Sequence, residues 1–192
     1  MKFTRRRFVE IMKNSAIFLL VFLGFSKFGR IKADELELRP PGAVDEEAFI
    51  AGCIRCGVCV DTCLNRYTGV LKPMTLADGY YNAGLPTFNT PKTYCLRCME
   101  CTTACPTGVL KEVPSDKLGI GTAFINIEEC LAYNGEDCLE CVKHCEIGAA
   151  VEINDLPTVK EDICDGCGTC VYFCPAKTRY LKPDASKRQP RR

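Results

Sequence analysis

The chain has 192 residues, of which sixteen are cysteine, one is histidine and none is tryptophan. This cysteine content predicts either a disulfide framework or a metal-binding protein. A single histidine without an evident nucleophile partner disfavours hydrolytic or acid–base catalysis. Residues 1–33 hold eight Lys/Arg and one Glu (+7), whereas residues 34–192 hold 17 Lys/Arg and 23 Asp/Glu (−6). Because nucleic-acid binding needs a basic face, the acidic body predicts no nucleic-acid partner.

The first 33 residues have the pattern of an export signal. Thr4-Arg5-Arg6-Arg7-Phe8 is similar to a twin-arginine signal, which exports proteins that are already folded. The apolar stretch at 15–25 would extend only ~17 Å as a helix, against a hydrocarbon core of about 30 Å. We expect a protein on the periplasmic side of the cytoplasmic membrane. Residues 1–33 are then either a signal cleaved after Ala33 or an uncleaved membrane tether.

The sixteen cysteines fall into four quartets, at residues 53–63, 95–105, 130–145 and 164–174. Three quartets have the spacing C-x2-C-x2-C-x3-C, and the third has C-x7-C-x2-C-x3-C. In bacterial ferredoxins, three cysteines of such a run bind one [4Fe–4S] cluster and the fourth binds the neighbouring cluster. We therefore predict four [4Fe–4S] clusters. The predicted iron ligands are Cys53, Cys56, Cys59, Cys63, Cys95, Cys98, Cys101, Cys105, Cys130, Cys138, Cys141, Cys145, Cys164, Cys167, Cys170 and Cys174.

Two alternatives compete with iron–sulfur clusters. Eight disulfides would suit an exported chain, but cysteines spaced three apart, four times over, fit long-range bridges poorly. All-cysteine zinc sites typically use two separated C-x2-C pairs, without a third cysteine three residues on. His144 lies next to Cys145, and we expect it to be structural or exposed because each quartet already supplies four thiolates.

Residues around the cysteines also suit clusters. Gly57, Gly166 and Gly168 are expected to let the backbone approach sulfur closely. Pro106 and Pro175 follow the last cysteine of their quartets, a position that Leu64 and Glu146 occupy in the first and third quartets. Eight apolar residues are expected to shield the clusters from water: Ile54, Val58, Leu96, Met99, Leu139, Val142, Ile163 and Val171.

Short β-rich runs between the quartets predict hairpins. They pair 69–73 with 86–88, 109–113 with 122–127, and 149–153 with 157–160. The predicted fold class is α+β, with two bacterial-type dicluster ferredoxin modules of small antiparallel hairpins and short helices, related by a pseudo-twofold axis. Such modules bury little apolar surface, so we expect the cofactors to stabilise them. The four-cluster domain would span 34–183, and 184–192 would be a disordered basic tail.

Ligand sharing leaves two arrangements of the quartets. In the nested arrangement, which we favour, the hairpin of 109–113 with 122–127 pairs quartets two and three, and quartets one and four pair with each other. A strand at 47–51 would then lie beside one at 179–182. Cys174 would complete the site of the first quartet, and Cys63 that of the fourth. Cys145 would complete the second, and Cys105 the third. In the adjacent arrangement, which the hairpin within 149–160 favours, quartet one pairs with two and quartet three with four.

Several motifs resemble those of the NapG/MauM-type ferredoxins. They are Arg39-Pro-Pro-Gly-Ala43 with Phe49 and Cys53-Ile-Arg-Cys-Gly-Val-Cys59, then Cys105-Pro-Thr-Gly108, and Cys130-Leu-Ala-Tyr-Asn-Gly-Glu-Asp-Cys138. The resemblance covers roughly residues 4–182. It implies a twin-arginine-exported carrier of four [4Fe–4S] clusters that works with a membrane-bound quinol-oxidising ferredoxin-type protein. Electrons would pass to a periplasmic reductase such as nitrate reductase, or to a multihaem cytochrome; the alternative implied role is methylamine dehydrogenase assembly.

The sequence therefore predicts an electron-transfer protein and not an enzyme, associated with the membrane through its partner or an uncleaved N-terminus. The alternative function is an iron–sulfur subunit or assembly factor of another anaerobic oxidoreductase. A catalytic reductase is disfavoured because the sequence shows no flavin, molybdenum or nucleotide motif.

Overall fold

The computed structural model describes residues 37–90, 92–177, 179–184 and 186. These residues belong to one compact unit, Leu36–Arg192. The predicted signal at 1–33 lies outside the described residues, as does the basic tail from 187 onward. Along the described ranges, no helix has the length and apolarity needed to cross a membrane.

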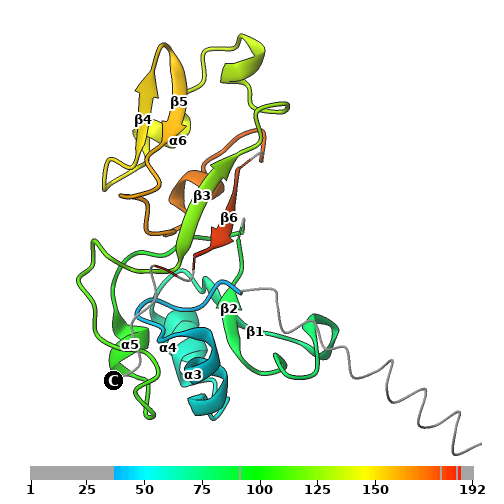
Figure 1. Cartoon of the computed structure of the whole chain (residues 1–192), viewed down its shortest axis with the longest axis vertical. Helices are drawn as coiled ribbons and strands as arrows, with labels where there is room; N and C mark the ends of the chain where they lie inside the picture. The colour runs from blue at the N-terminus through cyan, green and yellow to red at the C-terminus, as the bar shows by residue number, and fades with distance from the viewer. Residues whose placement is uncertain (1–36, 91, 178, 185, 187–192) are drawn as a thin grey trace, which may run out of the picture. The chain divides into compact units, whose positions relative to one another are not determined.

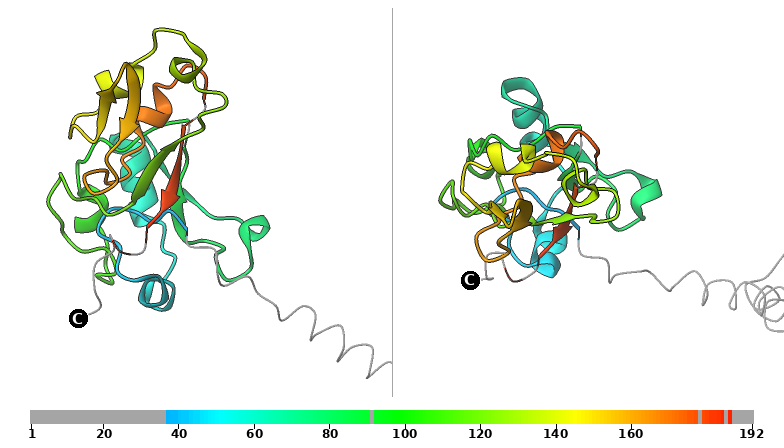
Figure 2. Two further views of the ribbon diagram at one scale, coloured as in Figure 1. Left: turned by 45° about the horizontal axis from the view of Figure 1, so that its top comes forward. Right: turned by 90° about the horizontal axis from the view of Figure 1, so that it is seen from above.

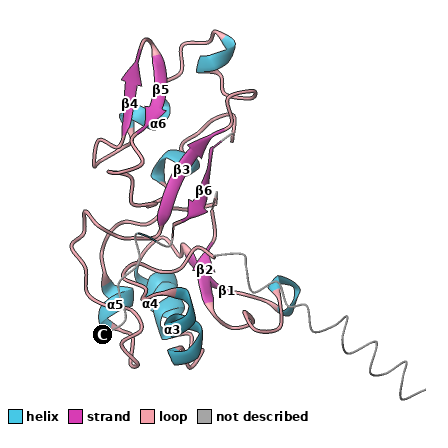
Figure 3. Ribbon diagram, viewed as in Figure 1, coloured by secondary structure: helices cyan, strands magenta, loops and turns pink. Residues whose placement is uncertain are grey.

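Short helices and short strands alternate along the chain (Figures 1 and 3). The α-helices are α3 (Glu46–Gly52), α4 (Val58–Arg66), α5 (Glu100–Thr103), α6 (Glu140–Lys143) and α7 (Thr169–Tyr172), and the 3-10 helices are η1 (Leu76–Asp78) and η2 (Ala132–Asn134). The strands are β1 (Leu71–Pro73), β2 (Pro86–Phe88), β3 (Gly121–Ile125), β4 (Ala150–Ile153), β5 (Leu156–Val159) and β6 (Arg179–Pro183). The mixture of helix and strand agrees with the predicted α+β class.

The amino-terminal module, residues 37–111, contains the first two quartets and closes on itself. Its antiparallel strands β1 and β2 pair Leu71 with Phe88, which confirms the predicted hairpin. Its two ends meet where Ala43 bridges Leu110 and the Lys111 amide donates to the Gly42 carbonyl, with an N···O distance of 2.8 Å. The segment after the second quartet therefore pairs backward, with residues that precede the first.

Residues 47–51 form part of helix α3 and not the strand that we predicted. The Asp45 side chain accepts a hydrogen bond from the Ala48 amide at 3.0 Å, and Glu46 and Glu47 occupy the first turn. An aspartate cap followed by acidic residues favours a helix start because both complement the unpaired amides there. Phe49 is the buried residue of this helix and anchors it to the core.

The carboxy-terminal module, residues 121–183, contains the third and fourth quartets. Strands β4 and β5 form the predicted hairpin, in which Asn154 and Asp155 both have positive φ, as a tight two-residue turn requires. Strands β3 and β6 lie side by side (Figure 2) and pair along their length. In this register Phe124 is opposite Tyr180. This pairing joins the beginning of the module to its end.

The predicted hairpin of 109–113 with 122–127 is wrong. The backbone of 109–111 already bonds to 42–44, and β3 bonds to β6. Pro114 lacks an amide hydrogen, so it cannot extend a strand ladder from 113. The connection between the modules is instead part of the core, because Leu118 and Ile120 are fully buried and pack with Phe88.

Candidate iron–sulfur sites

The cysteine side chains line four pockets. Each cavity is lined by three cysteines of one quartet and the last cysteine of the adjacent quartet. Site 1 is lined by Cys53, Cys56, Cys59 and Cys105. Site 2 is lined by Cys63, Cys95, Cys98 and Cys101. Site 3 is lined by Cys130, Cys138, Cys141 and Cys174. Site 4 is lined by Cys145, Cys164, Cys167 and Cys170.

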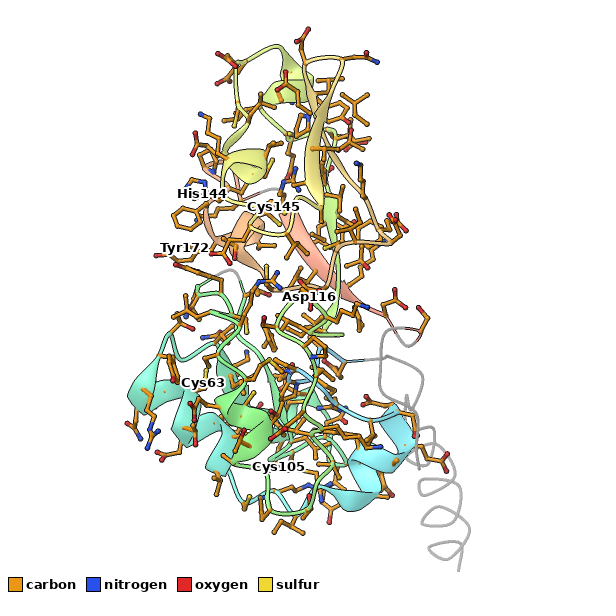
Figure 4. The ribbon with its side chains drawn as sticks, turned by 90° about the vertical axis from the view of Figure 1, so that its left-hand side faces the viewer. Cys63, Cys105, Asp116, His144, Cys145 and Tyr172 are labelled. Atoms are coloured by element: carbon orange, nitrogen blue, oxygen red, sulfur yellow. The ribbon has the colours of Figure 1, made fainter. Side chains whose placement is uncertain are left out.

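The quartets are thus paired one with two and three with four, and the nested pairing that we favoured is wrong. Helix α4 shows how the sharing arises, because Cys59 and Cys63 are four residues apart on it and yet line different sites. Figure 4 shows Cys63 and Cys105 in the same part of the molecule, near α4 and α5, with Cys145 well apart from them. The backward closure of each module brings its own two quartets together.

Three of the four cysteine loops share one backbone conformation. Positive φ occurs two residues after the first cysteine, at Arg55, Arg97 and Gly166, and again directly after the second cysteine, at Gly57, Met99 and Gly168. These turns fold the loop back over its own sulfurs; the Arg97 amide donates to Cys95 Sγ at 3.4 Å. The third quartet differs, since Leu139 after Cys138 has φ −124°. Glycine adopts this left-handed conformation without strain at Gly57, Gly166 and Gly168, whereas Arg55, Arg97 and Met99 adopt it with full side chains.

The expected apolar shielding is only partly present. Val171 is buried, as predicted, whereas Ile54 is 66% exposed and Leu96 is 49% exposed although both line their sites. Cys56 and Cys98 are exposed as well. Sites 1 and 2 therefore each present one side to solvent, because the loop that holds them lies at the surface.

Cys170 is buried and Cys59 is half-buried. Burial, together with repulsion from Cys53 and Cys105, raises the pKa of Cys59 to about 12. Burial also raises the pKa of Cys170 to about 12, although Arg179 opposes the shift. Buried thiols gathered in this way need a cation to become thiolates, and iron would supply that charge.

The cysteine geometry tests the two alternatives to clusters. All sixteen cysteines lie in the described part of the chain, and none is joined in a disulfide. Among the described residues, no group of three or more His, Cys, Asp and Glu could hold a single metal ion. Zinc would draw four sulfurs to about 2.3 Å from one point. The cysteines instead surround cavities, as a four-iron cube requires.

A buried arginine at site 3 also suits a negatively charged occupant. Arg179, which lines site 3, is 4% exposed, and its Nη2 donates to Cys141 Sγ at 2.7 Å. Its Nη1 is buried without a hydrogen-bond partner among the described atoms. Because a buried charge is costly unless it is paired, this guanidinium suits a site whose occupant is negative. Sequence reasoning missed Arg179; the only local signal was its place in a β-rich run.

Cysteines of neighbouring sites pack in common clusters of side chains. Cys59 of site 1 and Cys167 of site 4 both pack against the cluster that holds three of the site 2 cysteines, and Cys141 of site 3 packs with Cys170 of site 4. Burial is the largest cause that raises the pKa of Cys101, and repulsion from Cys59 of site 1 adds to it. Burial likewise dominates the raised pKa of Cys95, to which Cys167 of site 4 contributes. The pKa of Cys170 in site 4 is raised mainly by burial, and repulsion from Cys141 of site 3 adds to the increase. The sites therefore follow one another in the order 1, 2, 4, 3.

His144 has a structural place, as expected. It lies next to Cys145 (Figure 4), and its ring stacks on Phe173 at 3.9 Å between centroids. Its Nδ1 lies 2.8 Å from the Glu140 carbonyl oxygen. These contacts connect the end of α6 with the end of α7.

Two family models match the chain. One is described as a 4Fe-4S dicluster domain and matches residues 52–110, which contain the first two quartets. The other is described as a 4Fe-4S binding domain and matches residues 157–180, which contain the fourth. A single dicluster match over quartets one and two agrees with their pairing in the structure.

Similar proteins of known family cover most of the chain. The ferredoxin-type protein NapG of Escherichia coli is 36% identical over 199 aligned positions, which cover 93% of this chain and 84% of NapG. The methylamine utilization ferredoxin-type protein MauM of Methylorubrum extorquens is 37% identical over 160 positions, which cover 74% of this chain and 70% of MauM. The MauM of Methylobacillus flagellatus is 38% identical over 152 positions, covering 71% and 63%. The chain is therefore an iron–sulfur electron-transfer protein and belongs to the NapG/MauM family of ferredoxin-type proteins.

Proposed function

We propose that this protein is an exported carrier of four [4Fe–4S] clusters, held by all sixteen cysteines, one cluster in each of sites 1 to 4. It relays single electrons from a membrane-bound quinol-oxidising ferredoxin-type protein to a periplasmic reductase such as nitrate reductase, or to a multihaem cytochrome. The observation that carries the proposal is the gathering of four cysteines around each of four cavities.

The chain's own residues supply what a relay needs. The clusters, when bound, provide reversible one-electron chemistry. The cysteine loops hold the sites at fixed positions, and the packing of cysteines from site 1 through sites 2 and 4 to site 3 supports an uninterrupted series. The two modules, for which we propose a pseudo-twofold relation, owe much of their stability to the clusters because cysteines form so much of their core.

Export and partner choice rest on the sequence. The twin-arginine pattern at Arg5 and Arg6 suits a protein that must fold around its clusters before it crosses the membrane. Residues 34–192 have a net charge of −6 (17 − 23), to which four clusters with four thiolates each would add about −8. Such a surface would steer the protein toward basic patches on its partners.

The MauM relatives support a second candidate function. Their identity to this chain is similar to that of NapG, and their names place them in methylamine utilization. The chain would then be an iron–sulfur subunit or assembly factor of another oxidoreductase, with no electron relay of its own.

The two functions differ in whether the clusters exchange electrons with partners. Protein purified anaerobically should contain about sixteen iron and sixteen acid-labile sulfur atoms per chain. Membrane vesicles that hold the quinol-oxidising partner should reduce it, and periplasmic reductase with nitrate should reoxidise it at the rate of turnover. Loaded clusters that neither partner reduces nor reoxidises would favour the second function. Iron near zero would end the cluster proposal itself.

A further inference from the structure

We propose that Arg179 makes the cluster of site 3 the more readily reduced cluster of the carboxy-terminal module. The inference rests on the proposed function, because it requires that site 3 hold a [4Fe–4S] cluster. Arg179 is the first residue of β6 and follows the fourth quartet. The register of β6 against β3, with Arg179 opposite Ile125, fixes its position.

The guanidinium faces the cysteines of two sites. Its Nη2 lies 2.7 Å from Cys141 Sγ of site 3, and its charge also favours the thiolate of Cys170 in site 4. Arg179 lines site 3 itself. Site 3 therefore has the direct contact, and site 4 has only a longer-range interaction.

The charge of Arg179 is not already neutralised by a carboxylate. No ion pair joins it to an Asp or Glu among the described side chains, and its buried Nη1 lacks a hydrogen-bond partner there. Arg97 gives the contrast: it lies near Cys167 of site 4, but its guanidinium is paired with the Asp165 carboxylate. Of these two arginines, Arg179 is the one with a full charge to offer to a cluster.

The sign of the effect follows from the charge change on reduction. A [4Fe–4S] core with four thiolates carries about −2 when oxidised and about −3 after it accepts one electron. A buried cation stabilises the more negative, reduced state of the cluster. N–H groups that donate hydrogen bonds to its sulfur ligands also favour the reduced state. Reduction at site 3 is thus favoured by charge and by hydrogen bonding, in a place where water screens neither.

The test is a dithionite redox titration of the full-length, cluster-loaded protein, followed by electron paramagnetic resonance. Arg179→Gln should lower the reduced-to-oxidised ratio of one cluster by about tenfold at a fixed potential, a shift of about 59 mV for a one-electron couple. That cluster should be the one whose spectrum changes in Cys138→Ser, since Cys138 lines site 3. Iron and sulfide are assayed in every sample, so that a wild-type protein without clusters would refute the proposed function and not this inference.

Two further variants provide controls. Lys182→Gln removes one positive charge from the exposed face of the same strand, where Lys182 lies over the Phe124 ring, and should change the ratio less than threefold. Arg179→Lys keeps the positive charge but loses the forked geometry of the guanidinium donors. It should therefore lower the reduced-to-oxidised ratio less than Arg179→Gln does. Equal effects of Arg179→Gln and Lys182→Gln would overturn the proposal, as would an Arg179→Lys effect as large as that of Arg179→Gln.

If Arg179→Gln loses iron from site 3, a spectroscopic test decides. Wild-type protein labelled with ¹⁵N-arginine should show a nitrogen hyperfine coupling to a reduced cluster, and Arg179→Lys should abolish it. Absence of a coupling that depends on Arg179 would overturn the proposal without any need for the glutamine variant.

Discussion

The backbone amide of Cys95 donates a hydrogen bond to the carbonyl oxygen of Cys167, with an N···O distance of 2.8 Å. Cys95 belongs to site 2 and Cys167 to site 4, so this bond joins the two modules at their inner sites. A buried ion pair lies beside it, in which Arg97 donates two hydrogen bonds to the carboxylate of Asp165, one of them at 2.9 Å. The Asp165 carbonyl also accepts the Ile120 amide, which ties the connection between the modules to the same place.

Breaking the buried pair should destabilise the loaded protein. Asp165→Asn leaves Arg97 with only its longer ion pair to the exposed Glu146 carboxylate, at 3.7 Å between nitrogen and oxygen. Losing one partner of a buried pair typically costs about 3 to 5 kcal/mol, and because Glu146 remains, we expect a loss near ~3 kcal/mol. For a domain of this size, the melting temperature should fall by roughly 6 to 12 °C or more. The matched control is Lys143→Ala, which breaks the exposed pair of Lys143 with Glu140 and should leave the melting temperature unchanged. Equal melting temperatures for the two variants would mean that the Arg97–Asp165 pair contributes little.

Each module should load its own two clusters. A fragment of residues 37–120, which includes the buried Leu118 and Ile120, should hold about eight iron atoms after anaerobic reconstitution, because it contains all cysteines of sites 1 and 2. A fragment of residues 86–155 contains the second and third quartets and should fail to load stably. The reverse result would restore the nested pairing of quartets.

Gly42→Ala should weaken the closure of the amino-terminal module. Gly42 has φ +70°, and a Cβ at this position would lie 1.9 Å from the Lys111 carbonyl oxygen. The matched control is Gly108→Ala, since Gly108 has the same φ of +70° but an added Cβ meets nothing within 4 Å. The control should cost about 1 to 2 kcal/mol from backbone strain alone, and Gly42→Ala should cost clearly more. Thermal melting of the two loaded variants measures the difference, and equal losses would show that the contact with Lys111 relaxes freely.

Removal of iron should unfold the protein. Cysteines make up much of the two clusters of buried side chains around sites 2 and 4, so empty sites would leave cavities in the core. A chelator under anaerobic conditions should abolish near-ultraviolet circular dichroism, and reconstitution with iron and sulfide should restore it. A stripped protein that keeps its native spectrum would show that the polypeptide folds without clusters.

Export should depend on the paired arginines. The double variant Arg5→Lys, Arg6→Lys should accumulate in the cytoplasm with its clusters intact, because the twin-arginine route requires both arginines and acts on folded protein. Both must change, since Arg7 would still form an arginine pair with Arg6 if only Arg5 were replaced, and would partly rescue the signal. Cell fractionation with an iron assay measures the outcome, and undiminished periplasmic protein would contradict the predicted signal.

Cysteine spacing by itself predicted how the sites are made. The three cysteines of each run approach one another because the loop between them is short, and the following helical turn carries the fourth cysteine to another site. The hairpin of β4 and β5 was equally predictable, since Asn154-Asp155 between two β-rich runs is a local turn signal. These features depend only on residues that are close to one another in the sequence.

Only the tertiary structure decided which quartets share ligands. The choice depends on the bridge between Ala43 and Leu110 and on the pairing of β3 with β6, contacts between segments distant in sequence for which the chain has no local pattern. The same holds for Arg179 and for the Arg97–Asp165 pair, whose partners come from other quartets. An arginine in a sequence is ordinarily a solvated surface charge; burial against a sulfur or a carboxylate follows from packing, because the surrounding chain excludes the water that would otherwise solvate it.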